Sequence, residues 1–121
     1  MIEGTRDTTG TEVLFEFPCG ALEPSEEPAD AAIRETREET GWDATDLRPL
    51  GSFVEAPGVS AARCFVFTAR VSPGGEASLE AGEAWTPAVV SPARLRSLTA
   101  EGRIQDAGTL AALALYSALE R

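Results

Sequence analysis

Three glutamates, Glu35, Glu38 and Glu39, stand at positions i, i+3 and i+4 of a segment that favours a helix. At 100° per residue, side chains with this spacing share about a third of the helix circumference. Like charges placed so closely repel one another, and a hard dication removes that penalty. Magnesium prefers oxygen ligands and keeps several waters, which leaves positions for phosphate oxygens and an attacking water. The spacing therefore indicates a magnesium site, with a solvated acidic helix face as the alternative.

The rest of the composition limits the chemistry that is available. The chain contains no histidine, which excludes Ser-His-Asp and Cys-His catalysis and histidine-ligated zinc. The net charge of −10 would repel the phosphate backbone of a nucleic-acid polymer, which excludes that class of partner. An anionic small molecule would need a cation to bridge it to such an acidic protein. Carboxylates must therefore carry any acid–base or metal chemistry.

A longer spacing surrounds the three glutamates. Its order is Gly20, five residues, Glu26, seven residues, and then Arg34-Glu35-Thr36-Arg37-Glu38-Glu39-Thr40-Gly41-Trp42. This pattern resembles the Nudix box over residues 20–42, because every position that requires one residue type is filled. The departures are Thr36 at an apolar position and Trp42 where an aliphatic residue is commoner.

The resemblance to the Nudix hydrolase family implies an α/β fold, an α/β/α sandwich with a mixed sheet. It also implies that Glu35, Glu38 and Glu39 bind magnesium, or alternatively manganese, together with a backbone carbonyl at Cys19 or Gly20. By the same resemblance Arg34 orients the carboxylates, Glu26 supports the site, and Arg34, Glu35, Glu38 and Glu39 form the catalytic set. The reaction implied is hydrolysis of a diphosphate linkage in a small nucleoside-diphosphate substrate.

Three outer segments are similar to the ADP-ribose pyrophosphatase-like branch of this family. They are the approach Phe15 to Gly20, the loop Ala56 to Ser60, and the tail Gly102 to Leu110. This similarity favours ADP-ribose or a nucleotide sugar as the substrate, and it implies a homodimer. Arg63 is a candidate for binding a substrate phosphate.

The chain departs from that branch in two ways. The segment Ser60-Ala61-Ala62-Arg63 lacks the glutamate that the branch usually carries there, and only one strand is predicted before the box. The alternative function is therefore a catalytically weak or inactive nucleotide-binding sensor. The candidates for a replacement proton acceptor are Glu55, Glu76, Glu80 and Glu83, or Glu35 or Glu38 on the helix itself.

The elements that must position these groups follow from local signals. Ser25 is the predicted N-cap of a helix that runs to Thr40, with Gly41 as its stop. Ser91 and Asp106 are the predicted caps of two later helices, and the last helix is expected to bury Leu110, Leu113, Ala114 and Ala118. The predicted strands are residues 12–17, 47–55, 63–71 and 84–90.

The length of 121 residues predicts a single domain over residues 1–121. The longest apolar run, Leu110 to Tyr116, is too short to span a membrane, and the first residues lack the apolar stretch of a signal peptide. We therefore expect a cytoplasmic protein without membrane partners.

Cys19 and Cys64 show no metal or disulfide spacing and are expected to be reduced thiols.

Overall fold

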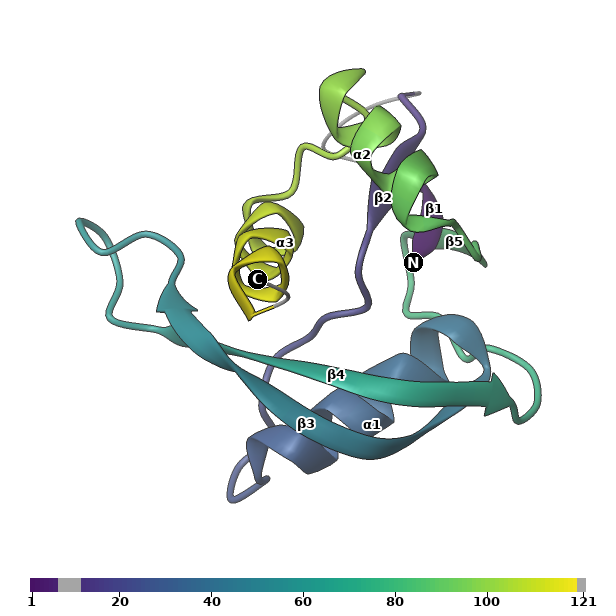
Figure 1. Ribbon diagram of the computed structural model, residues 1–121. Coiled ribbons are helices and arrows are strands. Elements are labelled where there is room, and N and C mark those ends of the chain that lie inside the picture. The colour runs from purple at the N-terminus through teal and green to yellow at the C-terminus, as the bar shows by residue number, and fades with distance from the viewer. Residues whose placement is uncertain (7–11, 120–121) are drawn as a thin grey trace.

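The computed structural model describes residues 1–6 and 12–119 as two antiparallel sheets with three helices (Figure 1). One sheet has the strand order β2-β1-β5, and the other is a hairpin of β3 and β4. The strands are β1 (Ile2–Arg6), β2 (Leu14–Glu16), β3 (Trp42–Val54), β4 (Arg63–Pro73) and β5 (Glu83–Pro87). The helices are α1 (Pro28–Thr40), α2 (Pro92–Ala100) and α3 (Ala107–Leu119).

The α/β class predicted from the sequence is confirmed. Both α1 and α3 pack against β3, and the hairpin runs between these two helices in Figure 1. Within the described residues every strand pairing is antiparallel, so the parallel pairs of a mixed sheet are not found there. Among the same residues, no helix has the length and apolarity needed to cross a membrane.

Strand β1 was not predicted, and it corrects the expectation of a single strand before α1. Its sequence offers one large apolar residue, Ile2, which is fully buried. The strand forms because it pairs with β2 on one side and β5 on the other, which are long-range contacts without a local signature. Gly4 permits this close approach, since a Cβ there would lie 2.0 Å from the Ala84 carbonyl oxygen.

The boundaries of α1 agree with the prediction at one end and differ at the other. Gly41 adopts a left-handed conformation (φ 72°), and its N–H donates to the Arg37 carbonyl at 2.8 Å, as predicted. The expected N-cap at Ser25 is wrong, because Ser25 lies in a preceding turn with φ 65° and Glu27 is the capping residue. Pro28 at the first helical position fixes where the helix begins.

The caps of the later helices are confirmed. The Ser91 hydroxyl accepts a hydrogen bond from the Arg94 N–H, and the Asp106 carboxylate accepts one from the Thr109 N–H at 2.6 Å. The predicted apolar face of α3 is wrong, however. Ala114 and Ala118 are exposed, whereas Thr109 is buried.

The inward position of Thr109 has a polar cause. Its hydroxyl accepts a hydrogen bond from the Phe17 N–H at 2.9 Å, which ties α3 to the segment that leads into the site. Periodicity of apolar residues alone does not reveal that contact.

The core lies between the three-stranded sheet and the C-terminal third of the chain. Phe15, Leu98 and Ile104 form its buried centre, with Leu95 and Leu113 packed against it. The Arg103 guanidinium lies 5.5 Å from the Phe15 ring centroid and donates two hydrogen bonds to the Val13 carbonyl. This cluster holds β2, and with it the approach to the site, against α2.

Leu98→Ala should destabilise the protein by about 2–5 kcal/mol, because Leu98 is fully buried and its removal leaves a cavity in a small core. The exposed Leu119 provides the matched control, and Leu119→Ala should change stability by less than about 0.5 kcal/mol. Urea unfolding measures both. Equal losses in the two variants would contradict this description of the core.

Candidate functional site

A cleft of about 370 Å³ opens between α1 and the loop that connects β4 to β5. One wall is formed by the α1 carboxylates and the approach residues Cys19 and Gly20, and the other by the connecting loop. The α1 carboxylates are Glu35, Glu38 and Glu39, and the other wall consists of Ser78 and Glu80 from the loop and Glu83 at the first residue of β5. The structure therefore brings the three glutamates predicted from spacing into one cleft.

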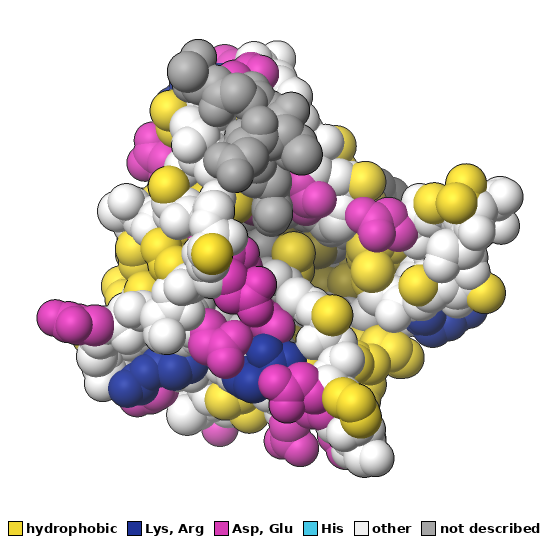
Figure 2. Space-filling view, turned by 180° about the vertical axis from the view of Figure 1, so that it is seen from behind, with side chains coloured by type: hydrophobic (Ala, Val, Ile, Leu, Met, Phe, Trp, Pro, Cys, Tyr) yellow, Lys and Arg dark blue, Asp and Glu magenta, His cyan; other side chains and the backbone are white. Residues whose placement is uncertain are grey.

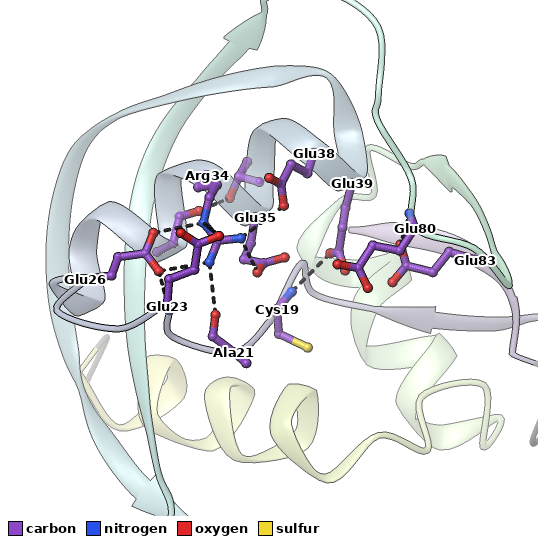
Figure 3. Close-up of polar contacts among 12 residues, drawn as sticks. Cys19, Ala21, Glu23, Glu26, Arg34, Glu35, Glu38, Glu39, Glu80 and Glu83 are labelled. Atoms are coloured by element: carbon purple, nitrogen blue, oxygen red, sulfur yellow. Dashed lines mark hydrogen bonds and ion pairs between the residues drawn. The ribbon is translucent and has the colours of Figure 1, made fainter.

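Arg34 donates hydrogen bonds to several groups that lie along one wall of the cleft (Figure 3). Its Nε and Nη2 donate to the two Glu26 oxygens, both at 2.9 Å, and Nη2 also donates to the Ala21 carbonyl at 3.0 Å. Its Nη1 donates to Glu35 at 2.6 Å and to Glu38 at 3.1 Å. All five N–H groups of the guanidinium are thus used, and they fix three carboxylates and the approach loop.

The bidentate pair between Arg34 and Glu26 shifts both groups toward their charged forms. Hydrogen bonds from Arg34, and next the one from the Glu23 N–H at 2.9 Å, lower the pKa of Glu26 from 4.5 to about 2. Hydrogen bonds to Glu26 and Glu35 raise the pKa of Arg34. Glu26 is therefore an anion at neutral and mildly acidic pH, and it supports Arg34.

Gly20 is required by the position of Glu35. A Cβ at Gly20 would lie 2.0 Å from the Glu35 carboxylate, closer than any real contact allows. The absence of a side chain therefore lets the approach loop pass directly beside this carboxylate. Gly20 and Glu35 therefore pack directly against each other.

Glu39 is the most enclosed of the α1 carboxylates, with 3% of its surface exposed. Its Oε2 accepts a hydrogen bond from the Cys19 N–H at 3.1 Å. The sequence pointed to a backbone carbonyl at Cys19 or Gly20 as a ligand. Both residues line the cleft, and the contact seen at Cys19 is made by its N–H. A ligand role for either carbonyl stays a prediction.

The opposite wall is built around a tight turn. The Glu80 N–H donates to the Glu83 carboxylate at 3.0 Å, and the Glu83 N–H donates to the Glu80 carbonyl at 3.1 Å. Figure 3 shows Glu80 and Glu83 reaching toward Glu39 from this side. Of the four loop glutamates considered as proton acceptors, Glu80 and Glu83 line the cleft, whereas Glu55 and Glu76 do not.

The cleft is strongly negative. Within residues 1–6 and 12–119, six glutamates and one arginine line it, which gives a formal charge of −5. Acidic side chains also gather around basic ones on the face shown in Figure 2. Because like charges at close range repel one another, this lining favours a bound cation, and six carboxylates are the donors that a hard divalent ion prefers.

The carboxylate oxygens of the cleft suit such a cation chemically, but the carboxylates are not arranged around one position. Within residues 1–6 and 12–119, no three acidic or thiol side chains converge closely enough to hold a metal ion as they stand. In this arrangement Glu35 and Glu38 accept hydrogen bonds from Arg34, and Glu39 accepts one from the Cys19 N–H.

Arg63 lies elsewhere. It is exposed at the start of β4, its Nη1 donates to the Ser52 hydroxyl at 3.0 Å, and it does not line the cleft. Its role toward a substrate phosphate stays a prediction.

Cys19 and Cys64 are not joined in a disulfide, as predicted. Burial, and next the charges of Glu55 and Asp106, raise the pKa of Cys64.

Sequence reasoning missed two contributors. Ser78 lines the cleft, and its N–H bonds to the Glu38 carbonyl at 2.7 Å. The second is Arg37, which bonds to Asp43 and to the Gly74 carbonyl. The adjacent Gly74-Gly75 pair is the one sequence signal near these contacts, and it indicates only a turn.

Comparison with known proteins gives one family and two partial relatives. A family model described as the NUDIX domain matches residues 1–113. Over 56 residues the chain is 41% identical to an ADP-ribose pyrophosphatase of Bacillus subtilis (strain 168), covering 46% of this chain and 30% of the relative. Over 45 residues it is 42% identical to a methanol dehydrogenase activator of Bacillus methanolicus, covering 37% and 24%. The matched stretches thus span less than a third of each relative.

The stability of the protein should depend on Glu26 in acid. Since the pKa of Glu26 is lowered on folding, its contribution is complete above pH 4.5 and is lost as the pH falls toward 2. Glu26→Gln should therefore be less stable at neutral pH and should lose less stability between pH 4.5 and pH 2.5. Urea unfolding across this range measures the effect, with the exposed Glu76→Gln as control. Parallel curves for wild type and Glu26→Gln would contradict it.

Gly20→Ala should weaken cation binding while leaving the fold largely intact. The added Cβ would displace the Glu35 carboxylate, which is the mobile end of a side chain, so the stability loss should stay within about 1 kcal/mol. Calorimetric titration with Mn²⁺ measures the affinity. Gly58→Ala is the matched control, because a Cβ there meets nothing within 4 Å. Wild-type affinity in Gly20→Ala would contradict the predicted role of Glu35.

Proposed function

Because the chain belongs to the NUDIX domain family, we propose that it is a metal-dependent hydrolase that cleaves the diphosphate linkage of a nucleoside-diphosphate derivative. The observation that carries this proposal is the cleft, in which the α1 glutamates face the loop glutamates Glu80 and Glu83. Such a lining repels a phosphate-bearing substrate unless a cation lies between them. Magnesium, or manganese in its place, fits these oxygen donors.

Glu35, Glu38 and Glu39 are the proposed metal ligands, with a backbone carbonyl at Cys19 or Gly20 as a further one. When bound, the metal supplies Lewis-acid polarisation of the phosphoryl oxygens and of water. Arg34 is the proposed orienting residue. Its hydrogen bonds to Glu35 and Glu38 set the direction in which these carboxylates point, and its pair with Glu26 fixes the guanidinium.

The proposed reaction is hydrolysis. A water oxygen attacks one phosphorus of the diphosphate, the bridging P–O bond breaks, and the bridging oxygen leaves with the other phosphate. The proton of the water passes to a carboxylate of the cleft. Glu80 and Glu83 are the favoured acceptors, since they line the cleft without being tied to Arg34, whereas Glu35 and Glu38 are tied to it.

The proposed substrate is ADP-ribose or a nucleotide sugar. The support comes from one relative, which is named an ADP-ribose pyrophosphatase and is matched over part of its length. A second candidate function is a catalytically weak or inactive sensor that binds a nucleotide. The absence of a glutamate in Ser60-Ala61-Ala62-Arg63 favours it.

A homodimer is also proposed. Its support is Val71 and Val89, two exposed apolar residues that line a second, mainly apolar groove and that a second copy of the chain would cover. Sedimentation equilibrium tests the proposal, and a monomer at tens of micromolar would contradict it. Location in the cytoplasm stays a prediction.

The test of the enzymatic proposal incubates the protein with ADP-ribose, nucleotide sugars, dinucleoside polyphosphates and nucleoside triphosphates, each with magnesium, with manganese or with chelator. We expect metal-dependent release of two phosphate-ended products from at least one nucleoside-diphosphate derivative. Measurable nucleotide binding without any metal-dependent product would contradict hydrolysis and favour the sensor.

Glu39→Gln should lower kcat by about 100-fold or more, because it removes one anionic donor from the metal site. It should also weaken Mn²⁺ binding, which calorimetry measures without turnover. Glu76→Gln is the matched control, since Glu76 lies in the same loop region as Glu80 but does not line the cleft. Full activity in Glu39→Gln would contradict the assignment of Glu39 as a metal ligand.

A further inference from the structure

The loop that carries the second wall is seated on the last turn of α1 by backbone contacts. The Gly74 N–H donates to the Gly41 carbonyl at 3.1 Å, and the Ser78 N–H donates to the Glu38 carbonyl at 2.7 Å. A Cβ at Gly41 would lie 2.3 Å from the Gly75 carbonyl oxygen, so the contact leaves no space for a side chain. The loop is thereby anchored by the Glu38 carbonyl, one of the last carbonyls of α1 and without a partner within the helix, and by the carbonyl of the C-cap residue Gly41.

Arg37 holds the start of the same loop from the side. Its Nη1 donates to the Asp43 carboxylate and its Nη2 donates to the Gly74 carbonyl at 2.9 Å. A Cβ at Gly74 would lie 2.1 Å from Nη1, and one at Gly75 would lie 2.9 Å from Nη2. The Gly-Gly pair thus makes room for the guanidinium between the turn and the first residues of β3.

The pair of Arg37 and Asp43 is half-exposed, with 41% and 54% of the side chains accessible, so as an ion pair it contributes little to stability. Its importance lies in geometry. A planar guanidinium can direct parallel donors to two acceptors at once, which a lysine ammonium on a flexible stem does less well. Here one acceptor is on β3 and the other is in the loop.

The loop needs such a restraint because its carboxylates face others of the same charge. Glu80 and Glu83 share the cleft with Glu39 and the other α1 glutamates, and among the residues that the structure describes Arg34 is the one cation lining it. Repulsion across the cleft would move the loop toward solvent. The backbone contacts to α1 and the guanidinium of Arg37 oppose that movement.

The structure assigns Arg37 the role of a positioning residue that holds residues 74–83 against α1, so that Glu80 and Glu83 face Glu39 across the cleft. Arg37 does not line the cleft itself and acts through the loop. This inference rests on the proposed function, because it concerns the second wall of the same cation-dependent site.

The test compares Arg37→Gln and Asp43→Asn with Arg94→Gln. Arg94 pairs with Glu101 at 3.0 Å, with 48% and 49% of the side chains accessible, and is a closely matched exposed ion pair away from the cleft. The first readout is amide hydrogen exchange by NMR in the protein without nucleotide. In Arg37→Gln and Asp43→Asn, the Gly74 and Ser78 amides should exchange about tenfold faster or more, while amides in the middle of α1 keep wild-type rates. Arg94→Gln should change none of them.

The second readout is function. Mn²⁺ should bind several-fold more weakly to Arg37→Gln by calorimetry, and kcat should fall about tenfold with KM within about twofold of wild type, since a displaced wall misplaces reacting groups without removing them. Arg37→Lys keeps the charge and should give intermediate exchange rates and Mn²⁺ affinity. It also provides a folded variant if Arg37→Gln is unstable.

A double-mutant cycle tests whether Arg37 acts through the loop carboxylates. In a Glu80→Gln, Glu83→Gln background, Arg37→Gln should cause little further loss of Mn²⁺ affinity, because the groups it positions no longer carry charge. Fully additive losses would contradict the assignment. Wild-type exchange at Gly74 and Ser78 in Arg37→Gln, or equal acceleration in Arg94→Gln, would also overturn it.

The two proposals fail in different ways. If the wild type binds Mn²⁺ but hydrolyses no substrate, the proposed reaction is wrong, while exchange and Mn²⁺ affinity still decide the role of Arg37. If the wild type hydrolyses a substrate and Arg37→Gln matches it in exchange, affinity and kcat, the hydrolase stands and the positioning role is wrong.

Discussion

The guanidinium of Arg34 is the contact on which the candidate site depends. It lies among glutamates that would otherwise repel one another, and its five hydrogen bonds reach Glu26, Glu35, Glu38 and the Ala21 carbonyl. Glu26 completes the arrangement, because its two oxygens match the planar fork of the arginine. The acidic face of α1 can therefore form before any cation binds, and its carboxylates are already directed along one side of the cleft.

The two walls of the cleft are joined through the last turn of α1. That turn carries Glu38 and Glu39 on one side, and its terminal carbonyls receive the loop that carries Glu80 and Glu83. The last turn of α1 therefore determines where Glu38 and Glu39 lie and also where the loop opposite them lies. Under the proposed function, this connection would place carboxylates on both sides of a bound cation.

Local signals in the sequence predicted α1, its stop at Gly41 and the caps at Ser91 and Asp106, because each depends on the residue's own backbone or side chain. Strand β1 escaped prediction because its pairing partners lie far along the chain. Ser25 satisfied the composition of an N-cap, but Pro28 places the start of the helix later.

In the candidate site, too, some residues could be predicted from local sequence and others could not. The spacing of Glu35, Glu38 and Glu39 predicted that they share a face, and the structure brings them into one cleft. The sequence offered four loop glutamates as equal candidates for the proton acceptor. Glu80 and Glu83 are distinguished from Glu55 and Glu76 by the docking of the loop, which uses backbone groups of Gly74 and Ser78 that any residue possesses.

The central claim is that the cleft between α1 and the 74–83 loop is a cation site. Anomalous diffraction from crystals of the protein soaked with Mn²⁺ tests it most directly, because the signal locates the ion without reference to activity. We predict a peak in the cleft, in contact with carboxylates of the set Glu35, Glu38 and Glu39. Saturating Mn²⁺ with no peak in this cleft, or with peaks only elsewhere on the acidic surface, would contradict the claim.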